Sequence, residues 1–217
     1  MFRDRRDAGQ KLARALSKYR NRGVLVLAIP RGGAEVGFEV AKHLNAEFSL
    51  IVSRKLPFPD NPESGFGAIA EDGSTFIYKD AVGRVPEAAV QRIARDQRRE
   101  IARRIEVLRG GAPLPPMEGR TVILVDDGIA MGSTMRASIM LCKKRGAKKI
   151  VVAAPVAGAD VAGEIRRIVD EVVILEIPRF FQAVAQVYRN WCDLTDEDVC
   201  DIVAICDTPG DNGIHPS

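Results

Sequence analysis

Short apolar runs rich in β-branched residues alternate along this chain with longer amphipathic segments, and this alternation restricts the fold more than any other feature. Strands that are separated by helices are joined by crossovers, which place neighbouring strands parallel. The pattern therefore predicts an α/β fold, with a Rossmann-like parallel sheet flanked by helices. The expected strands are 24–29, 48–53, 120–126, 149–154 and 171–176, and the expected helices are 4–20, 33–44, 86–109, 132–145 and 158–168.

A stretch rich in proline and glycine interrupts the alternation at residues 57–80. Its apolar segments FGAIA and TFIY flank an Asp-Gly pair at 72–73, which favours the tight turn of a hairpin. We expect this insertion to form a lid or hood on a single domain that spans residues 1–217. The Gly/Pro stretch at 110–118 and the tail at 208–217 are expected to be flexible.

Two adjacent carboxylates directly follow the apolar run 122–125. Asp126 and Asp127 open a turn of small residues that leads into a helix, in the run VILVDDGIAMGST. We expect Ser133 or Thr134 to cap that helix. Amides left unpaired at its start, together with the helix dipole, favour a phosphate, while the acids suit hydroxyls or a hydrated divalent cation. A sugar phosphate satisfies both demands, and the alternative is an acidic strand end in an ordinary α/β protein.

Two basic groups follow the first two expected strands. Arg31, Gly32 and Gly33 come after the first strand, and Arg54 and Lys55 come after the second. Because the carboxyl ends of parallel strands share one edge of a sheet, these cations should face the same side as the acids. They are therefore candidates for binding a second anion. Taken alone, the first group could be a turn with a surface arginine and the second a solvated basic pair.

The acidic run resembles the phosphoribosyl pyrophosphate (PRPP) motif of type I phosphoribosyltransferases. That motif has two acidic residues, three variable residues and then Thr-Gly-x-Thr. Here Asp126, Asp127, Gly132 and Thr134 match it, while Met131 replaces the first Thr. The chain up to about residue 199 also resembles a bacterial and archaeal branch of the family whose acceptor is unassigned. The resembling segments are 29–33, 54–56, 62–63, 67–69 and an aromatic stretch that begins near 180.

The resemblance implies a role for each matching position. The catalytic carboxylates Asp126 and Asp127 would hold the ribose hydroxyls and Mg²⁺. The 5-phosphate of PRPP would be bound by Gly128, Ala130, Met131, Gly132, Ser133 and Thr134. Its pyrophosphate would be bound by Arg31, Gly32, Gly33, Arg54 and Lys55, with a cis peptide between Pro30 and Arg31. The acceptor base would stack on Phe180 or Phe181, for which core packing is the alternative.

Two departures from the family pattern concern the phosphate loop. Met131 lacks the hydroxyl that the family Thr offers to a phosphate oxygen, so weaker phosphate binding is expected. Ala130 stands where the 6-oxopurine enzymes of the family resemble one another in carrying an aspartate base. The missing carboxylate argues against hypoxanthine or guanine as the acceptor.

The resemblance thus predicts an enzyme, a pentosyltransferase of nucleoside metabolism. It would transfer ribose 5-phosphate from PRPP to a nucleobase or other nitrogen nucleophile and release pyrophosphate. Fixed charges would stabilise a cationic ribose ring and an anionic leaving group. The alternative is a non-catalytic regulator of the same fold that senses PRPP or a nucleotide, and Met131 together with the unassigned acceptor favours it slightly.

Composition and charge bear on partners and location. The chain starts with charged residues and has no 18-residue apolar run, so we expect a cytoplasmic protein without a membrane partner. A net charge of +3 is too small to imply nucleic acid. Seven arginines crowd the expected helix 86–109, but acidic residues interleave with them, which favours a salt-bridged surface over RNA binding. Homo-oligomerisation is left open. The expected helix 86–109 should bury an apolar stripe formed by Val90, Ala94, Ile101, Ile105 and Leu108.

Smaller signals concern cysteines and the C-terminal segment. The four cysteines contain no C-x-x-C pair, which indicates buried reduced thiols rather than zinc ligands or disulfides. Tyr188 and Trp191 are three residues apart and are expected on one helix face that packs into the core. Thr195 precedes an acidic turn and is expected to cap a last helix.

Overall fold

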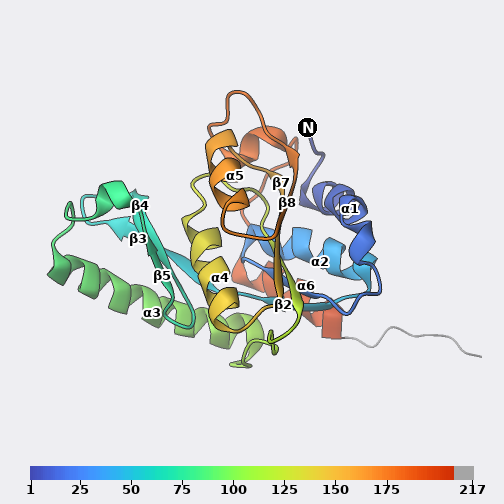
Figure 1. Ribbon diagram of the computed structural model, residues 1–217, viewed down its shortest axis with the longest axis horizontal. Helices are drawn as coiled ribbons and strands as arrows, with labels where there is room; N and C mark the ends of the chain where they lie inside the picture. The colour runs from blue at the N-terminus through green and yellow to red at the C-terminus, as the bar shows by residue number, and fades with distance from the viewer. Residues whose placement is uncertain (208–217) are drawn as a thin grey trace, which may run out of the picture.

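The computed structural model describes residues 1–207, apart from the side chains of Glu63, Cys206 and Asp207, so the expected tail at 208–217 lies outside the described residues. Figure 1 shows the arrangement of the elements. The helices are α1 (Arg5–Ala15), α2 (Gly32–Leu44), α3 (Glu87–Arg109), α4 (Ser133–Lys144), α5 (Ala159–Arg166) and α6 (Asp196–Asp207). The strands are β1 (Leu25–Ala28), β2 (Glu47–Leu50), β3 (Ser53–Phe58), β4 (Asn61–Ala70), β5 (Thr75–Ile77), β6 (Thr121–Val125), β7 (Lys149–Val156) and β8 (Glu171–Glu176).

A five-stranded parallel sheet forms the core, in the order β2-β1-β6-β7-β8. This confirms the predicted α/β class. The strand order reverses between β1 and β6, because β2 follows β1 on one side whereas β7 and β8 extend the sheet on the other. In open α/β sheets a reversal of this kind leaves a crevice at the carboxyl ends of the two strands, where ligands bind.

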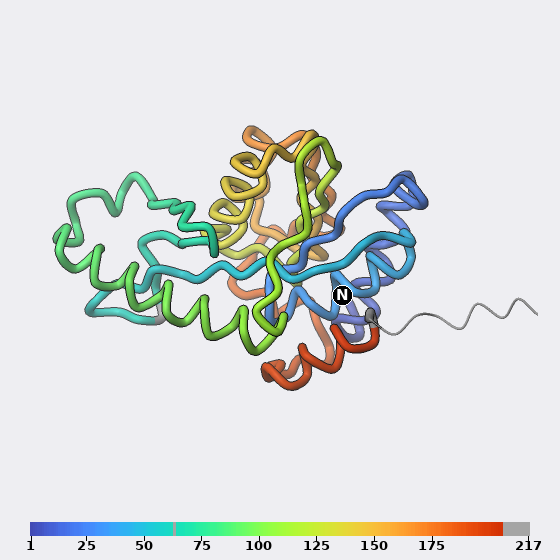
Figure 2. The backbone as a smooth tube through the Cα atoms, turned by 90° about the horizontal axis from the view of Figure 1, so that it is seen from below, coloured from blue at the N-terminus to red at the C-terminus, as the bar shows by residue number. Residues whose placement is uncertain are grey.

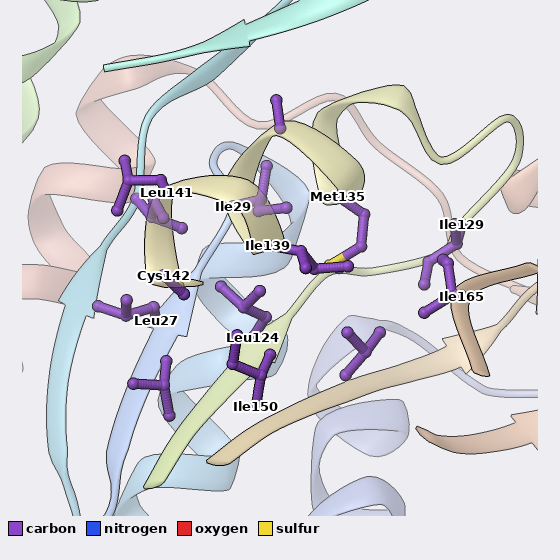
Figure 3. Packing of buried hydrophobic residues seen from close by; sticks show 14 of the residues in the cluster. Leu27, Ile29, Leu124, Ile129, Met135, Ile139, Leu141, Cys142, Ile150 and Ile165 are labelled. Carbon is purple, nitrogen blue, oxygen red and sulfur yellow. The ribbon is translucent and has the colours of Figure 1, made fainter. Parts of the chain in front are cut away.

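Alternate residues of the strands feed two separate apolar clusters. Leu27 and Leu124 point toward α4 and α5, where Met135, Ile139 and Cys142 cover them (Figure 3). Val26 and Ile123 point to the opposite face, which is covered by α1 and α2. Since both faces are covered, the strands consist of nearly uninterrupted apolar residues, as buried parallel strands do.

A second, antiparallel sheet of β3, β4 and β5 stands beside the core together with α3 (Figures 1 and 2). The expected turn at 72–73 is present: Gly73 has a φ of +87° and the amide of Ser74 donates to Asp72 Oδ1 at 2.9 Å. The expected strand 48–53 ends earlier, at Leu50, and the chain enters the second sheet at Ser53. Arg54 and Lys55 therefore lie inside β3, and their expected position at the end of a core strand is wrong.

Helix α3 packs on the second sheet through Val90, Ala94, Ile101 and Ile105 of the expected stripe, to which the structure adds Ile93. Leu108 instead packs in a separate cluster with Leu50 and Val199. Its exposed side carries the expected ion pairs, because Glu100 accepts from both Arg103 and Arg104. Exposed pairs of this kind solvate a helix surface and add little to stability. None of the helices within residues 1–207 combines the length and the hydropathy needed to cross a membrane.

The C-terminal segment differs in part from expectation. Thr195 caps α6 as predicted, since its Oγ1 accepts the amide of Asp198 at 3.1 Å. Tyr188 and Trp191 do not share a helix face: Tyr188 follows the 3-10 turn Val184–Val187, and Trp191 lies in the irregular chain beyond it. Tyr188 is buried, whereas Trp191 is 38% exposed, so core packing holds for the first alone.

The cysteines also differ from expectation. Cys142, Cys192 and Cys200 are free thiols, but only Cys142 among these three is buried. Burial raises the pKa of the Cys142 thiol to about 12, which keeps it protonated and unreactive.

One buried ion pair fastens α3 to the rest of the molecule and yields a prediction. Arg109 donates to Glu71 at 2.8 Å and to the carbonyl of Leu50 at 2.7 Å. Arg109→Met should lower the free energy of unfolding by about 3–5 kcal/mol at pH 8, because it strands a buried carboxylate. Burial raises the pKa of Glu71, so the loss should shrink toward pH 5, where that carboxyl takes up a proton. Urea denaturation at both pH values measures this.

Arg99→Met is the matched control, because Arg99 pairs with Asp96 on the exposed side of the same helix. Its urea midpoint should stay close to that of the wild type at both pH values. Equal losses in the two variants would show that the Arg109–Glu71 pair does not fasten α3.

Candidate functional site

A cavity of about 400 Å³ opens at the carboxyl end of β6, beside the point where the strand order reverses. The acidic turn and the start of α4 form one wall, and the second sheet forms the other. The lining residues are Lys55, Ser64, Gly65, Tyr78, Asp126, Gly128, Ile129, Ala130, Met131, Gly132, Ser133, Thr134 and Met135. The loop that the sequence predicts to bind phosphate thus lines a cavity, and Lys55, Ser64, Gly65 and Tyr78, in or next to the second sheet, line the facing side.

The glycine loop after β1 packs directly against the two acids. The strands are in register, with Ala28 opposite Val125, so the residues that follow them are neighbours. A Cβ on Gly32 would lie 1.7 Å from Asp127 Oδ2, and one on Gly33 would lie 3.0 Å from the Cα of Asp126. Only glycine therefore allows the two loops to approach this closely.

The N-terminus of α4 has the geometry of an anion-binding site. Gly132 is its N-cap with a φ of +74°, and a Cβ there would lie 2.6 Å from Val161 Cγ2. The first amides of a helix have no acceptor within it and point out of its N-terminus. The expected cap by Ser133 or Thr134 is wrong: both lie inside the helix, and the cap residue makes no side-chain hydrogen bond. Both hydroxyl residues instead line the cavity.

The carbonyl of Met131 is fixed by two donors that the sequence did not indicate. The hydroxyl of Tyr78, just after β5, donates to it at 2.7 Å, and Arg136 Nη1 on α4 donates to it at 2.9 Å. Arg136 is buried, pairs with Glu164 on α5 and lies 5.0 Å from the ring centre of Phe76. The side chain of Met131 is 69% exposed. The loop before α4 is thus held at one main-chain carbonyl by two side chains, Tyr78 next to the second sheet and Arg136 on α4.

Both acids are held in surroundings that disfavour their charge. Burial, and then the charge of Asp127, raise the pKa of Asp126 well above the usual range of a carboxyl. Burial also raises the pKa of Asp127, but Arg5 opposes that shift because its Nε lies 2.7 Å from Asp127 Oδ2. Both residues are thus partly buried, and only 14% of the Asp127 side chain is exposed.

Of the predicted pyrophosphate ligands, Lys55 alone is among the residues that line the cavity, and the three cations have different surroundings. Lys55 lines the cavity, and its stem crosses Gly65, whose Cβ would lie 2.3 Å from Lys55 Cγ. Arg54 points to the other side of β3, as alternate strand residues must, and donates to Gln97 on α3 at 3.2 Å. Arg31 is exposed and is the N-cap of α2. The peptide between Pro30 and Arg31 is cis, which confirms that expectation.

A second cavity of about 500 Å³ adjoins the first and shares Tyr78, Ala130 and Met131 with it. Phe181 lies on its far side, next to Gly158, whose Cβ would be 3.3 Å from the ring. Phe180 is 79% exposed and its ring faces Arg179 instead. Of the two aromatic candidates, the structure brings Phe181 to the site and leaves Phe180 outside.

The acids do not fit a divalent cation held by both of them. Such an ion needs several oxygen ligands, and Asp127 Oδ2 already faces the Arg5 guanidinium. Asp126 Oδ1 accepts the amide of Asp127 at 2.9 Å. Within residues 1–207, no three His, Cys, Asp or Glu side chains are grouped so that they could hold a metal ion. Mg²⁺ at these acids stays a prediction that this arrangement does not favour.

The geometry agrees with the comparison to known proteins. The model of the phosphoribosyl transferase domain matches residues 3–189. The chain belongs to the phosphoribosyl transferase family. This confirms the resemblance to type I phosphoribosyltransferases.

Three relatives show how far the similarity extends. Two Mycobacterium tuberculosis proteins, from strains CDC 1551 and H37Rv, are each named "Putative phosphoribosyl transferase" and are 42% identical over 201 residues. This match covers 92% of the present chain and 45% of each relative, so the chain spans about half of their length. The crystal structure of TT1426 from Thermus thermophilus is 37% identical, with a TM-score of 0.79 over 94% of this chain and 97% of that one.

The contact between Gly32 and Asp127 yields a prediction. Gly32→Ala should lower the thermal unfolding midpoint and displace the acidic turn, because the new methyl group would overlap the carboxylate. Gly163→Ala in α5 is the control, since nothing lies within 4 Å of the added Cβ. Alanine is the better helix former by roughly 0.5–1 kcal/mol, so the control should be equally or more stable. Unfolding followed by circular dichroism compares them, and equal midpoints would contradict the close approach of the two loops.

Proposed function

We propose that this protein transfers ribose 5-phosphate from PRPP to a nitrogen nucleophile and releases pyrophosphate. One observation carries the proposal: a helix start and a carboxylate line a single cavity at the strand-order reversal, and a glycine loop packs against that carboxylate. A phosphate, ribose hydroxyls and a second anion are the groups that such a set would bind together. Family membership supports the same reaction class.

Each part of PRPP has a proposed partner. The 5-phosphate would lie at the N-terminus of α4, where the amides of Ser133 and Thr134 and the helix dipole stabilise negative charge. Asp126 would accept hydrogen bonds from the ribose hydroxyls. The pyrophosphate would lie near Gly32 and Gly33, with Arg31 and Lys55 as its cations. Arg54 is left out of this set, because its side chain points to α3.

Fixed charges would then carry the catalysis. Breaking the bond from C1 to pyrophosphate leaves positive charge on the ribose ring and negative charge on the leaving group. A carboxylate beside the ring and cations beside the leaving group stabilise that separation without rearranging. The 5-phosphate is remote from C1, so its binding energy serves to position the reacting atom.

The acceptor would occupy the second cavity. It adjoins the first cavity at Ala130 and Met131, and Phe181 offers a ring for stacking. Ala130 provides no carboxylate to take a proton from a 6-oxopurine. The proposed acceptors are therefore nitrogen nucleophiles other than hypoxanthine and guanine.

A PRPP-sensing regulator is the second candidate, favoured by Met131, whose exposed side chain gives the phosphate loop no hydroxyl. Two measurements separate the candidates. Calorimetric titration with PRPP, with and without Mg²⁺, tests binding, and pyrophosphate release against a panel of nucleobases and amines tests turnover. Binding without release for any acceptor would favour the regulator, and no binding would rule out both.

Asp126→Asn tests the ribose contact. The variant should bind PRPP at least tenfold more weakly, since it loses the charge that favours the ribose hydroxyls. Because the folded protein raises the pKa of Asp126, ionisation destabilises the fold above the ordinary pKa of a carboxyl. Asn keeps the oxygen that accepts the Asp127 amide, so its unfolding midpoint at pH 8 should equal or exceed that of the wild type. Calorimetry and thermal unfolding check both effects.

Asp201→Asn, on the exposed surface of α6, is the control and should change neither quantity. Unchanged PRPP affinity in Asp126→Asn would remove Asp126 from the proposed site. Reduced affinity together with a lower midpoint would indicate a merely structural acid.

Met131→Thr tests the departure from the family motif. A threonine hydroxyl could donate to a phosphate oxygen, and hydrogen bonds to charged groups are worth roughly 1.5–3 kcal/mol before solvent competition. We therefore expect PRPP to bind a fewfold more tightly. Met131→Val, which has no hydroxyl, is the control and should leave the affinity unchanged. Equal gains in both variants would show that side-chain size, and not the hydroxyl, sets the affinity.

A further inference from the structure

Arg5 is almost fully enclosed, although its guanidinium stays charged. Only 5% of the residue is exposed, so protein groups must replace its water shell. Its Nε donates to Asp127 Oδ2 at 2.7 Å, and its Nη1 donates to the carbonyl of Cys192 at 2.7 Å. The guanidinium lies 3.9 Å from the ring centre of Trp191. The N-terminal helix and the segment after β8 therefore meet at this one side chain, directly behind the acidic turn.

Asp127 is held at its main chain as well as at its carboxylate. Its amide donates to Asp126 Oδ1 at 2.9 Å, and its carbonyl accepts from the hydroxyl of Tyr188 at 2.6 Å. The carboxylate lies against the backbone of the glycine loop, in the space that a Cβ on Gly32 would take. Asp127 thus connects α1, the C-terminal segment and the loop after β1.

The two adjacent acids consequently face different partners. Asp126 lines the cavity, whereas Asp127 is not among its lining residues, and its side chain is 14% exposed. A ligand that took Asp127 Oδ2 would displace a buried guanidinium and leave that charge unpaired, which is strongly unfavourable. The arrangement therefore keeps Asp127 bound to Arg5 while a ligand occupies the cavity.

We propose that Arg5 is a positioning residue that acts through Asp127, and that Asp126 is the acid that contacts the ribose. The Arg5–Asp127 pair holds the acidic turn against the Gly32–Gly33 loop, so that the ribose and pyrophosphate subsites keep their spacing. This assignment rests on the proposed function and deepens it. If Arg5 has this role, α1 contributes to ligand binding, although it is far from the acidic run 126–127 in sequence.

A double-mutant cycle separates this arrangement from direct contact between Asp127 and the ligand. The variants are Arg5→Gln, Asp127→Asn and the two combined, and the readout is the PRPP dissociation constant from calorimetry in the presence of Mg²⁺. If both residues act as one unit, each single change should weaken binding by roughly tenfold and the double change by about the same factor. If Asp127 contacts the ribose itself, Asp127→Asn should cost the same factor in either background, which gives roughly a hundredfold loss in the double variant.

Arg6→Gln is the matched control, because the adjacent arginine is 62% exposed and pairs with Glu39 instead. It should leave PRPP affinity unchanged. Arg5→Lys keeps the charge but lacks the planar fork that reaches Asp127 and Cys192 together, so an intermediate loss is expected. If Arg5→Gln does not fold, Arg5→Lys replaces it in the cycle, and Asp127→Asn should then cost less than it does in the wild type.

Two results would overturn the assignment: multiplying losses in the cycle, or an Arg5 variant with unchanged PRPP affinity, whether or not its stability is lower. Thermal unfolding of the same variants keeps the test independent of the proposed function. If the wild-type protein does not bind PRPP, the proposed function is ruled out. The positioning role in PRPP binding would lapse with that function, and the unfolding midpoints would then test only the Arg5–Asp127 unit, which additive losses would overturn and a non-additive loss would support.

Discussion

The pairing of β1 with β6 is the constraint on which the rest of the structure depends. It sets Ala28 opposite Val125, and the amide of Ile29 continues the ladder by donating to the carbonyl of Val125 at 2.9 Å. Two loops of unlike charge therefore leave the sheet side by side. Because β2 follows β1 away from β6, no crossover helix covers the gap between them. The cavity and the contact between the glycine loop and the acids both follow from this register.

Buried arginines hold together the helices and loops around the carboxyl ends of β1 and β6. Arg5 joins α1 and the C-terminal segment to the acidic turn, and Arg136 joins α4 to α5 and to the carbonyl of Met131. Arg109 joins α3 to the second sheet and to β2. A planar guanidinium can serve two or three partners at once, which suits it to junctions between elements. Each of these contacts makes the fold sensitive to substitution, because removing one partner leaves a buried charge unpaired and lowers stability.

Sequence reasoning found the core and much of the site because both leave local signals. Apolar runs of strand length indicated the parallel sheet, and the glycine pattern after Asp126 and Asp127 indicated the loop that lines the cavity. It failed where long-range packing decides the outcome. The run at 48–53 divides between two sheets, because its first half pairs with β1 and the following residues pair with β4. Arg54 consequently serves α3 while its neighbour Lys55 faces the cavity.

The sequence by itself determined the fold class, the family and the loops that carry the polar groups, because periodicity and motif spacing are properties of neighbouring residues. Only the tertiary structure decided which of two adjacent acids faces the cavity and which is bound to a cation. Arg5 lies 122 positions from Asp127 along the chain, and Tyr78 lies 53 positions from Met131. Contacts over such separations depend on how α1 and the second sheet are placed against the core, and no local pattern records that placement.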